Sequence, residues 1–416
     1  MRLKDVTEFC PAYSGGARND TVAFVPMEAL RYDSISQQEI PFDEARGKYT
    51  FFADGDLLFA KVTPCFENGN IAVAKDLKGG IGFGSSEIFV LRVKPGLNNR
   101  YLFYVVQSSP FMDGGCATMC GVGGLKRMSP LFPRTFEWEI PNEKSQRRIV
   151  AYLDEKAAAI DARVAVLEKK LAAYRRLKTS VINQAVTRGL DPKAEMKDSG
   201  VDWIGKIPAG WEARNLTQCC DFFKGLAITK ADLTESGTPV ISYGQIHSKL
   251  NIGTHLRPEL LRHVPEAIAA ADPGSRLKVG DIVFADTSED VEGCGNCVLI
   301  DAEFPVYAGY HAIVARPDES GRSRYLSYLF NAPRWRAQIR AKVAGIKVFS
   351  ITQRIFKGVS LLLPSVADAN AIADYLDAEC AKIDKAAGLV TREIELYRKL
   401  KRSLINEVVT GKRKVA

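Results

Sequence analysis

One stretch of the sequence occurs twice, and it decides the fold. Residues 140–189 read IPNEKSQRRIVAYLDEKAAAIDARVAVLEKKLAAYRRLKTSVINQAVTRG, and residues 363–412 read LPSVADANAIADYLDAECAKIDKAAGLVTREIELYRKLKRSLINEVVTGK. The copies align without a gap at an offset of 223 residues (375 − 152), fixed by the triplets Tyr152-Leu153-Asp154 and Tyr375-Leu376-Asp377. A gapless duplication of this length indicates one structural unit that is used twice.

Each copy predicts a long amphipathic helix with a narrow coiled-coil seam. Apolar residues recur every seven positions, and a second row beginning at Val150 completes the alternating three-and-four spacing. A helix of about 45 residues spans on the order of 65 Å. A seam this narrow cannot bury itself alone, and its simplest partner is the other copy; two unrelated surface helices explain the repeat less well. The seam residues are Leu153, Ile160, Leu167, Tyr174 and Val181, and then Leu376, Ile383, Val390, Tyr397 and Leu404.

Composition limits the class of protein. A chain of 416 residues suits two or three domains, and a hydrophobic content of 46% suffices for ordinary cores. The nine cysteines are odd in number and irregular in spacing, which favours reduced thiols. No apolar run approaches the roughly 20 residues of a membrane span, and no signal peptide opens the sequence, so we expect a cytoplasmic protein. The net charge of +8 fits an anionic partner such as nucleic acid, although many basic proteins have none.

Two globular segments alternate with the predicted helices. The first, residues 1–139, predicts strands at 22–27, 57–62 and 88–93, a buried helix at 100–106 and a strand at 132–141. The second, residues 207–364, repeats its landmarks: residues 279–285 match 53–60, residues 325–330 match 101–106, and residues 345–350 match 124–129. The remaining sequence differs strongly between them. This pattern suggests constant spacers that carry two different readers.

The sequence contains no recognisable catalytic centre. It has no Pro-Pro dipeptide of the kind that clamps a flipped base and no nucleotide-binding G-x-x-x-x-G-K-[ST]. His311 has no nucleophile beside it in a recognisable elbow. Cys294 and Cys297 lack the second ligand pair that a zinc site needs. We therefore predict no catalytic residue, no metal site and no cofactor in this chain.

End to end, the chain resembles the specificity subunit of type I restriction–modification systems. The residues that carry the resemblance are the Gly-Asp-hydrophobic strands at Gly55 and Gly280 and the Gly-x-x-x-x-Ser turns at Gly124 and Gly345. The Ile-Pro and Leu-Pro lead-ins to the helices, residues 146–150 and the Ile-Pro-x-Gly-Trp segment at Ile207 add to them. The first globule lacks that last lead-in, so either its edge strand is short or the start codon lies upstream.

The resemblance implies an α+β fold: two globular mixed α/β target recognition domains, separated by two long antiparallel coiled-coil helices in a pseudo-twofold tandem repeat. The first domain would be residues 1–140, the central helix and connector 141–200, the second domain 201–364 and the last helix 365–416. Each domain would read half of a split target in double-stranded DNA. Two modification subunits would methylate adenine with S-adenosylmethionine. Two restriction subunits, using ATP and Mg, would complete an assembly in which this chain is not catalytic.

Polar clusters after equivalent landmark strands are the candidate base readers. Hydrogen-bonding side chains on such loops suit readout in the major groove, and the two globules differ at these places. The candidates in the first globule are Lys61, Thr63, Glu67, Asn68, Asn70, Lys126, Arg127 and Ser129. Those in the second are Tyr243, Gln245, Asp286, Thr287, Ser288, Asp290, Lys347, Ser350 and Gln353. The alternatives are ordinary solvated loops, an assembly protein whose globules bind other proteins, and an enzyme, such as a nuclease, with a cryptic site.

Overall fold

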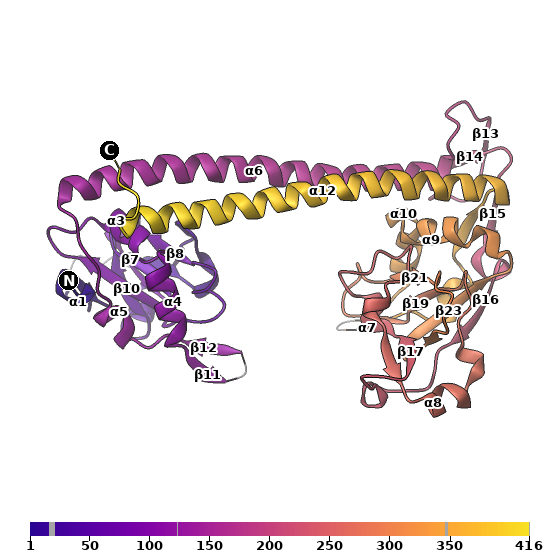
Figure 1. Ribbon diagram of the computed structural model, residues 1–416, viewed down its shortest axis with the longest axis horizontal. Helices are drawn as coiled ribbons and strands as arrows, with labels where there is room; N and C mark the ends of the chain where they lie inside the picture. Colours follow the sequence, from indigo (N-terminus) through magenta and orange to yellow (C-terminus); the bar gives the residue numbers. More distant parts are fainter. Residues whose placement is uncertain (16–20, 123, 346–347, 416) are drawn as a thin grey trace. The chain divides into compact units, whose positions relative to one another are not determined.

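The computed structural model describes residues 1–15, 21–122, 124–345 and 348–415. These divide into two compact units, residues 1–169 with 391–416 and residues 170–390. Two long helices, α6 (Glu143–Arg188) and α12 (Val366–Val409), contribute segments to both units (Figure 1). The two predicted long helices are thereby confirmed. In the described part of the chain no helix is both long and apolar enough to cross a membrane.

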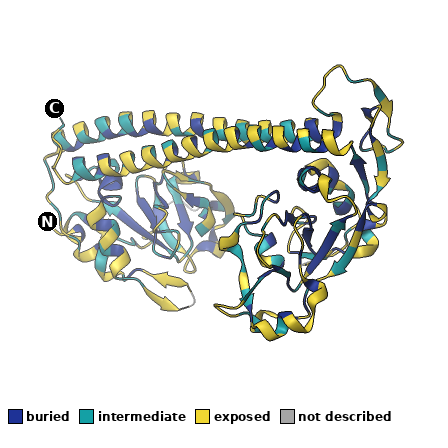
Figure 2. Cartoon of the chain, turned by 45° about the vertical axis from the view of Figure 1, so that its right-hand side comes forward, coloured by how far each residue is buried: buried dark blue, intermediate teal, exposed yellow. Residues whose placement is uncertain are grey.

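Within each unit the two helices pack against each other through the seam. In the first unit Leu153, Leu167 and Leu404 are buried, and in the second unit Leu376 and Val390 are buried. Ile160 and Ile383 are also buried, while Tyr174, Val181 and Tyr397 are half-buried. Along both helices in Figure 2, buried and half-buried residues in dark blue and teal alternate with exposed residues in yellow. Burial of one narrow stripe is what the heptad spacing requires.

Ion pairs across the seam fix its antiparallel register. In the first unit Lys401 Nζ lies 2.6 Å from Oδ2 of Asp161, and Arg398 Nη2 lies 2.8 Å from Oε1 of Glu168. In the second unit Lys178 Nζ lies 2.6 Å from Oδ2 of Asp384. The repeat offset converts Asp161 into Asp384 and Lys178 into Lys401. The two Lys–Asp contacts are therefore the same contact with the copies exchanged, which explains why both seams carry a lysine.

The globule of the first unit consists of two four-stranded sheets with short helices. An antiparallel sheet has the order β1 (Thr7–Phe9), β10 (Ile88–Val93), β7 (Leu57–Ala60), β8 (Ile71–Val73). The other has the order β5 (Gln38–Pro41), β2 (Thr21–Val25), β9 (Ile81–Gly84), β6 (Thr50–Ala53), with β2 and β9 parallel. Two small pairs are β3 (Leu30–Arg31) with β4 (Ser34–Ile35) and β11 (Cys120–Val122) with β12 (Leu125–Arg127). The helices are α1 (Leu3–Val6), α2 (Phe42–Ala45), α3 (Asn99–Val105), α4 (Ser109–Ala117) and α5 (Leu131–Thr135).

The globule of the second unit repeats this plan. Its antiparallel sheet has the order β16 (Cys220–Lys224), β23 (Ala312–Pro317), β19 (Ile282–Ala285), β21 (Cys297–Leu299), which matches β1-β10-β7-β8. A three-stranded sheet has the order β18 (Arg262–Val264), β17 (Thr238–Ile241), β22 (Tyr307–Ala308), again with one parallel pair. The small pairs are β13 (Met196–Asp198) with β14 (Lys206–Pro208), β15 (Glu212–Asn215) with β25 (Ser360–Leu363), and β20 (Thr287–Ser288) with β24 (Phe349–Ser350). The helices are α7 (Tyr243–Ile246), α8 (Glu266–Ala271), α9 (Ser323–Asn331), α10 (Pro333–Arg340) and α11 (Gln353–Phe356).

The Gly-Asp motif anchors the central strand pair of each antiparallel sheet. Asp56 is 2% exposed and receives both arms of Arg92, at 2.8 Å and 2.7 Å. Asp281 is 1% exposed and receives Arg316 at the same two distances. The preceding Gly55 and Gly280 have φ of +90° and +97°, a left-handed conformation that favours glycine. The motif therefore combines a tight turn with a buried bidentate ion pair.

The predicted strand at residues 132–141 is wrong. Residues 131–135 form α5, and only an isolated bridge, Arg2 with Glu137, follows it. In the second unit the equivalent place carries the four-residue ladder of β15 and β25. At this place the first globule has one bridge, whereas the second globule has a ladder of four residue pairs.

Adjacent residues on α6 offer a test of the seam. Leu167 is 2% exposed and Val166 is 56% exposed. We expect Leu167→Ala to lower the free energy of unfolding by about 2–5 kcal/mol, because it removes buried methyl groups and leaves a cavity. Val166→Ala should change it by less than about 0.5 kcal/mol. Urea unfolding followed by circular dichroism at the helix band compares them, and equal effects would contradict a buried seam at this register.

Candidate nucleic-acid interface

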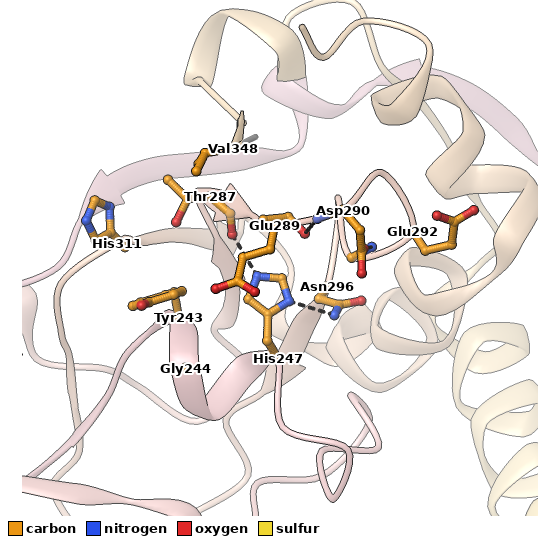
Figure 3. Close-up of a pocket in the computed structure, with 12 residues that line it drawn as sticks. Tyr243, Gly244, His247, Thr287, Glu289, Asp290, Glu292, Asn296, His311 and Val348 are labelled. Carbon is orange, nitrogen blue, oxygen red and sulfur yellow. Dashed lines mark hydrogen bonds between the residues drawn. The ribbon is translucent and has the colours of Figure 1, made fainter. Parts of the chain in front are cut away.

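A cavity of about 780 Å³ opens among the predicted reader residues of the second globule. Figure 3 shows its lining, which comes from α7, from the loop after β19 and from the loop before β23. Of the predicted residues, Tyr243, Thr287, Ser288 and Asp290 line it. The structure adds lining residues that the sequence did not single out as readers, namely His247, Glu289, Glu292, Asn296 and His311.

A chain of hydrogen bonds holds strand β20, which carries the predicted residues Thr287 and Ser288, in place. Arg336 Nη1 donates to Oδ1 of Asn296 at 2.6 Å, so the amide nitrogen of Asn296 points the other way, toward Nδ1 of His247 at 3.0 Å. Nε2 of His247 donates to the carbonyl oxygen of Thr287 at 2.7 Å. These partners fix His247 as the neutral Nε2–H tautomer. Burial lowers the pKa of Arg336.

The rim of this cavity is acidic. Glu289, Asp290 and Glu292 form no ion pair in the described part of the chain; Asp290 Oδ1 accepts the backbone N–H of Gly293 at 2.6 Å. Asp286 lies 3.0 Å from Nδ1 of His311. The Tyr243 ring meets the rings of His247 and His311 edge to face. The cavity is therefore lined by carboxylate hydrogen-bond acceptors and by the packed rings of Tyr243, His247 and His311.

The remaining predicted residues of the second globule lie around this site. Gln245 caps α7 by accepting the N–H of Ser242 at 3.0 Å. Ser350 is exposed on β24, where it pairs with Thr287, and Gln353 is exposed at the start of α11. Lys347 lies outside the described residues.

The first globule has the same backbone arrangement with different side chains. The N–H of Lys61 bonds Glu87 O at 3.0 Å, and its carbonyl accepts the N–H of Met128 at 2.7 Å. Asp286 makes the same two bonds, with His311 at 3.1 Å and Ile351 at 2.7 Å. Lys61 and Asp286 therefore occupy equivalent backbone positions and carry opposite charges.

Some predicted reader residues of the first globule form hydrogen bonds or ion pairs within it, and others differ in how far their side chains are exposed. Thr63 Oγ1 donates to Gly124 O and accepts the N–H of Lys126, both at 2.8 Å. Arg127 binds Glu87, with Nη2 to Oε1 at 2.8 Å. The side chains of Glu67, Asn68 and Lys126 are exposed, Ser129 is half-buried and Asn70 is buried. The β11–β12 hairpin that carries Lys126 and Arg127 is yellow, and so exposed, in Figure 2.

The aspartate of the Tyr-Leu-Asp triplet docks each globule on its helix. In the first unit Asp154 Oδ1 accepts Arg100 Nε at 2.8 Å and Tyr104 Oη at 2.5 Å. In the second unit Asp377 binds Arg324 and accepts Tyr328 Oη at 2.6 Å. Burial, followed by the hydrogen bond to the aspartate, raises the pKa of both tyrosines. We call each such set of three residues a docking triad.

The second docking triad has an additional partner, His255. Nδ1 of His255 lies 2.8 Å from Oδ2 of Asp301, and Nε2 lies 3.7 Å from Oδ1 of Asp377. The hydrogen bond with Asp301, and then the contact with Asp377, raise the pKa of His255 from 6.5 to about 9. The imidazole is therefore protonated at neutral pH.

Curated relatives include specificity subunits of type I restriction enzymes. The EcoEI specificity subunit of Escherichia coli is 38% identical over 154 residues, which are 36% of this chain and 26% of that protein. The MjaVIII specificity subunit of Methanocaldococcus jannaschii is 22% identical over 323 residues, 77% of this chain and 71% of that protein. The aligned residues span about a quarter of the EcoEI subunit, and the same holds for the EcoAI subunit. No protein-family model matches the chain.

Solved structures match over nearly the whole chain. A chain from a structure described as the basis of complex assembly and conformational transition of the type I R-M system covers 99% of this chain and 97% of its own length, with a TM-score of 0.72 and 18% identity. The chain is thus similar in sequence to type I specificity subunits over part of its length, and it has their fold over nearly all of it. The HsdS subunit from Thermoanaerobacter tengcongensis has a TM-score of 0.50 and 18% identity over 99% of this chain and 96% of its own. These structures confirm the α+β specificity-subunit fold over the full length.

The charge of His255 predicts a pH dependence that is confined to the second unit. Because the folded pKa is raised, its stabilisation is fully present below pH 6.5 and is lost as the pH rises through about 9. We expect His255→Gln to lower the unfolding temperature at pH 6 and to have little effect at pH 10. His263→Gln is the control, since no ion pair of His263 is present in the described residues. A deficit of His255→Gln that is equal at both pH values would contradict this assignment.

Proposed function

We propose that this chain is the DNA-reading, non-catalytic specificity subunit of a cytoplasmic type I restriction–modification complex. In this proposal residues 1–140 and 201–364 are two target recognition domains that read the halves of a bipartite target in double-stranded DNA. The segments 141–200 and 365–416 are the spacer. The similarity to type I specificity subunits and the duplicated design both support this role.

One observation carries the proposal: a constant scaffold presents unlike side chains at equivalent places. Both globules share a sheet order, a buried Arg–Asp pair and a docking triad. Lys61 and Asp286 occupy the same backbone position with opposite charge. A protein that reads two different sequences with one architecture requires this combination, since phosphate contacts position a reader and base contacts give it specificity.

The outer face of the two long helices exposes apolar residues at repeated positions, which suits the binding of two copies of one partner. Val166 and Leu389 are equivalent in the repeat and are 56% and 64% exposed, and Leu177 and Leu400 are equivalent and 48% and 52% exposed. Exposed apolar side chains at repeated positions suit association with identical partners. We propose that two modification subunits bind there and that two restriction subunits join the complex. S-adenosylmethionine, ATP and Mg would then act in those partners.

Mapping of adenine methylation by single-molecule sequencing tests the function directly. The chain is expressed with the modification subunit encoded beside it, in cells that lack other methylation. We expect a split motif with a fixed gap, and exchange of residues 201–364 for those of a relative should change one half only. A folded complex that produces no methylation would instead favour an assembly protein whose globules bind other proteins. Metal-dependent cleavage of DNA by the isolated chain would favour a cryptic nuclease.

Single substitutions in each globule should act on separate half-sites. Glu289 is exposed on the cavity rim, and Lys126 is exposed on the β11–β12 hairpin. Loss of one good base contact costs about 1–3 kcal/mol of discrimination. We expect Glu289→Gln to relax the motif only in the second half and Lys126→Gln only in the first. The relaxed positions appear in the same methylation map, and a change in both halves from either variant would contradict separate readers.

A further inference from the structure

A shallow basic groove lies between α6 and α10 in the second unit. Its volume is about 690 Å³, and no carboxylate is among its lining residues. Four of these are arginines: Arg175, Arg176 and Arg188 on α6, and Arg334 on α10. The others are hydroxyl or amide residues, namely Thr179, Ser180, Asn183, Gln184 and Thr187. Arginine with hydroxyl and amide groups is the composition that proteins use to bind phosphate.

The four arginines have no acidic partner in the described part of the chain, unlike Arg163 on α6 and Arg398 on α12. Arg163 pairs with Glu393 at 2.9 Å, and Arg398 pairs with Glu168 at 2.8 Å. The side chains of all four groove arginines are exposed. Four positive charges are thus gathered on one face without local neutralisation, which raises the concentration of anions there.

The repeat provides an internal comparison. Arg398 stands where Arg175 stands in the other copy, and there it is neutralised by Glu168. Glu407 replaces Gln184 and Gly411 replaces Arg188, so the second copy has an acid and one arginine fewer at these positions. The basic groove is therefore not a consequence of the helix repeat, and it belongs to the second unit.

Helix α10 connects this groove to the acidic cavity of the same unit. Arg334, near its start, lines the groove. Arg340, at its end, donates to the carbonyl oxygen of Glu292, and Arg336 binds Asn296. Arg340 follows Arg334 by six positions along the helix, a rise of about 9 Å. The DNA major groove is about 8.5 Å deep, so side chains that reach its floor lie about that far from the phosphates at its rim.

We propose that Arg175, Arg176, Arg188 and Arg334 bind the phosphodiester backbone of duplex DNA beside the bases that the second globule reads. The inference rests on the proposed function, because it takes the neighbouring cavity as the base-reading site. It assigns to the spacer helix α6 a direct part in binding DNA. Contacts to phosphate give affinity and salt dependence without sequence preference.

The test compares the variant Arg175→Gln/Arg176→Gln with the control Lys193→Gln/Lys197→Gln, which removes the same charge from exposed lysines of the connector. Fluorescence anisotropy measures binding of the full chain, with its modification subunit, to a target duplex and to a scrambled duplex at several salt concentrations. We expect the variant to lose about fivefold in affinity per phosphate contact at about 0.15 M salt, equally for both duplexes. The slope of log K against log[salt] should become shallower by about 1.8. The control should keep the wild-type slope.

Three results would overturn the proposal. One is an unchanged affinity and slope in the variant, while the wild-type complex still prefers the target duplex. Another is an equal loss of affinity in the control, which would indicate that only the overall positive charge of the protein attracts DNA. The third is a loss of modification-subunit binding with DNA affinity intact, which would assign the groove to an acidic protein surface. If the wild-type complex shows no preference for the target, the proposed function itself fails, and this outcome is distinct from the other three. Circular dichroism verifies that the variants are folded.

Discussion

The docking triad is the interaction on which each unit depends. A single helix carboxylate, Asp154 or Asp377, accepts hydrogen bonds from an arginine and a tyrosine of its globule. Charge-assisted bonds of this kind are short and directional, so they fix the rotation of the globule on the helix as well as its position. The same helix is registered to the other long helix by a Lys–Asp contact within the unit. The register of the two helices in the seam therefore helps to fix the position of the loops of the globule.

In each unit, few contacts connect the long helix to the loops of the globule. The triad arginine and tyrosine sit on α3 or α9, which packs on the antiparallel sheet through residues such as Tyr101 and Tyr325. The loop that carries the candidate reader residues follows the central strand β7 or β19 of that sheet. A buried aspartate paired with a half-buried arginine holds this strand to its neighbour, and removing the arginine is costly because it leaves the buried carboxylate unpaired. The constant residues are thus those that position the loops, and the loops themselves are free to differ.

The repeated and periodic features of the fold were predicted from the sequence, whereas contacts between distant segments were missed. Heptad spacing and the gapless duplication identified both helices, and the Gly-Asp turn identified the two central strands, because these signals are local or periodic. Glu87 and His311 were not among the predicted reader residues, since their positions beside Lys61 and Asp286 depend on strand pairing across long separations. The chain Arg336–Asn296–His247 likewise joins segments that no local pattern connects. The predicted strand at 132–141 failed because its ladder partner, present before Leu216, is reduced to one bridge at Arg2.

The second unit carries an acidic cavity and a basic groove. Its cavity presents Glu289, Asp290 and Glu292, which repel phosphate and suit only donors such as the amino groups on base edges. If this cavity reads bases as proposed, its carboxylates would not supply affinity for the phosphate backbone, and cations elsewhere on the unit would have to supply it. The basic groove beside α10 meets this requirement. The first globule carries lysine at Lys61 and Lys126 among its reader residues, and the helix copy that packs on it has Gly411 in place of Arg188. Under the proposed function, the two helix copies would differ at this face because the candidate readers beside them carry opposite charge.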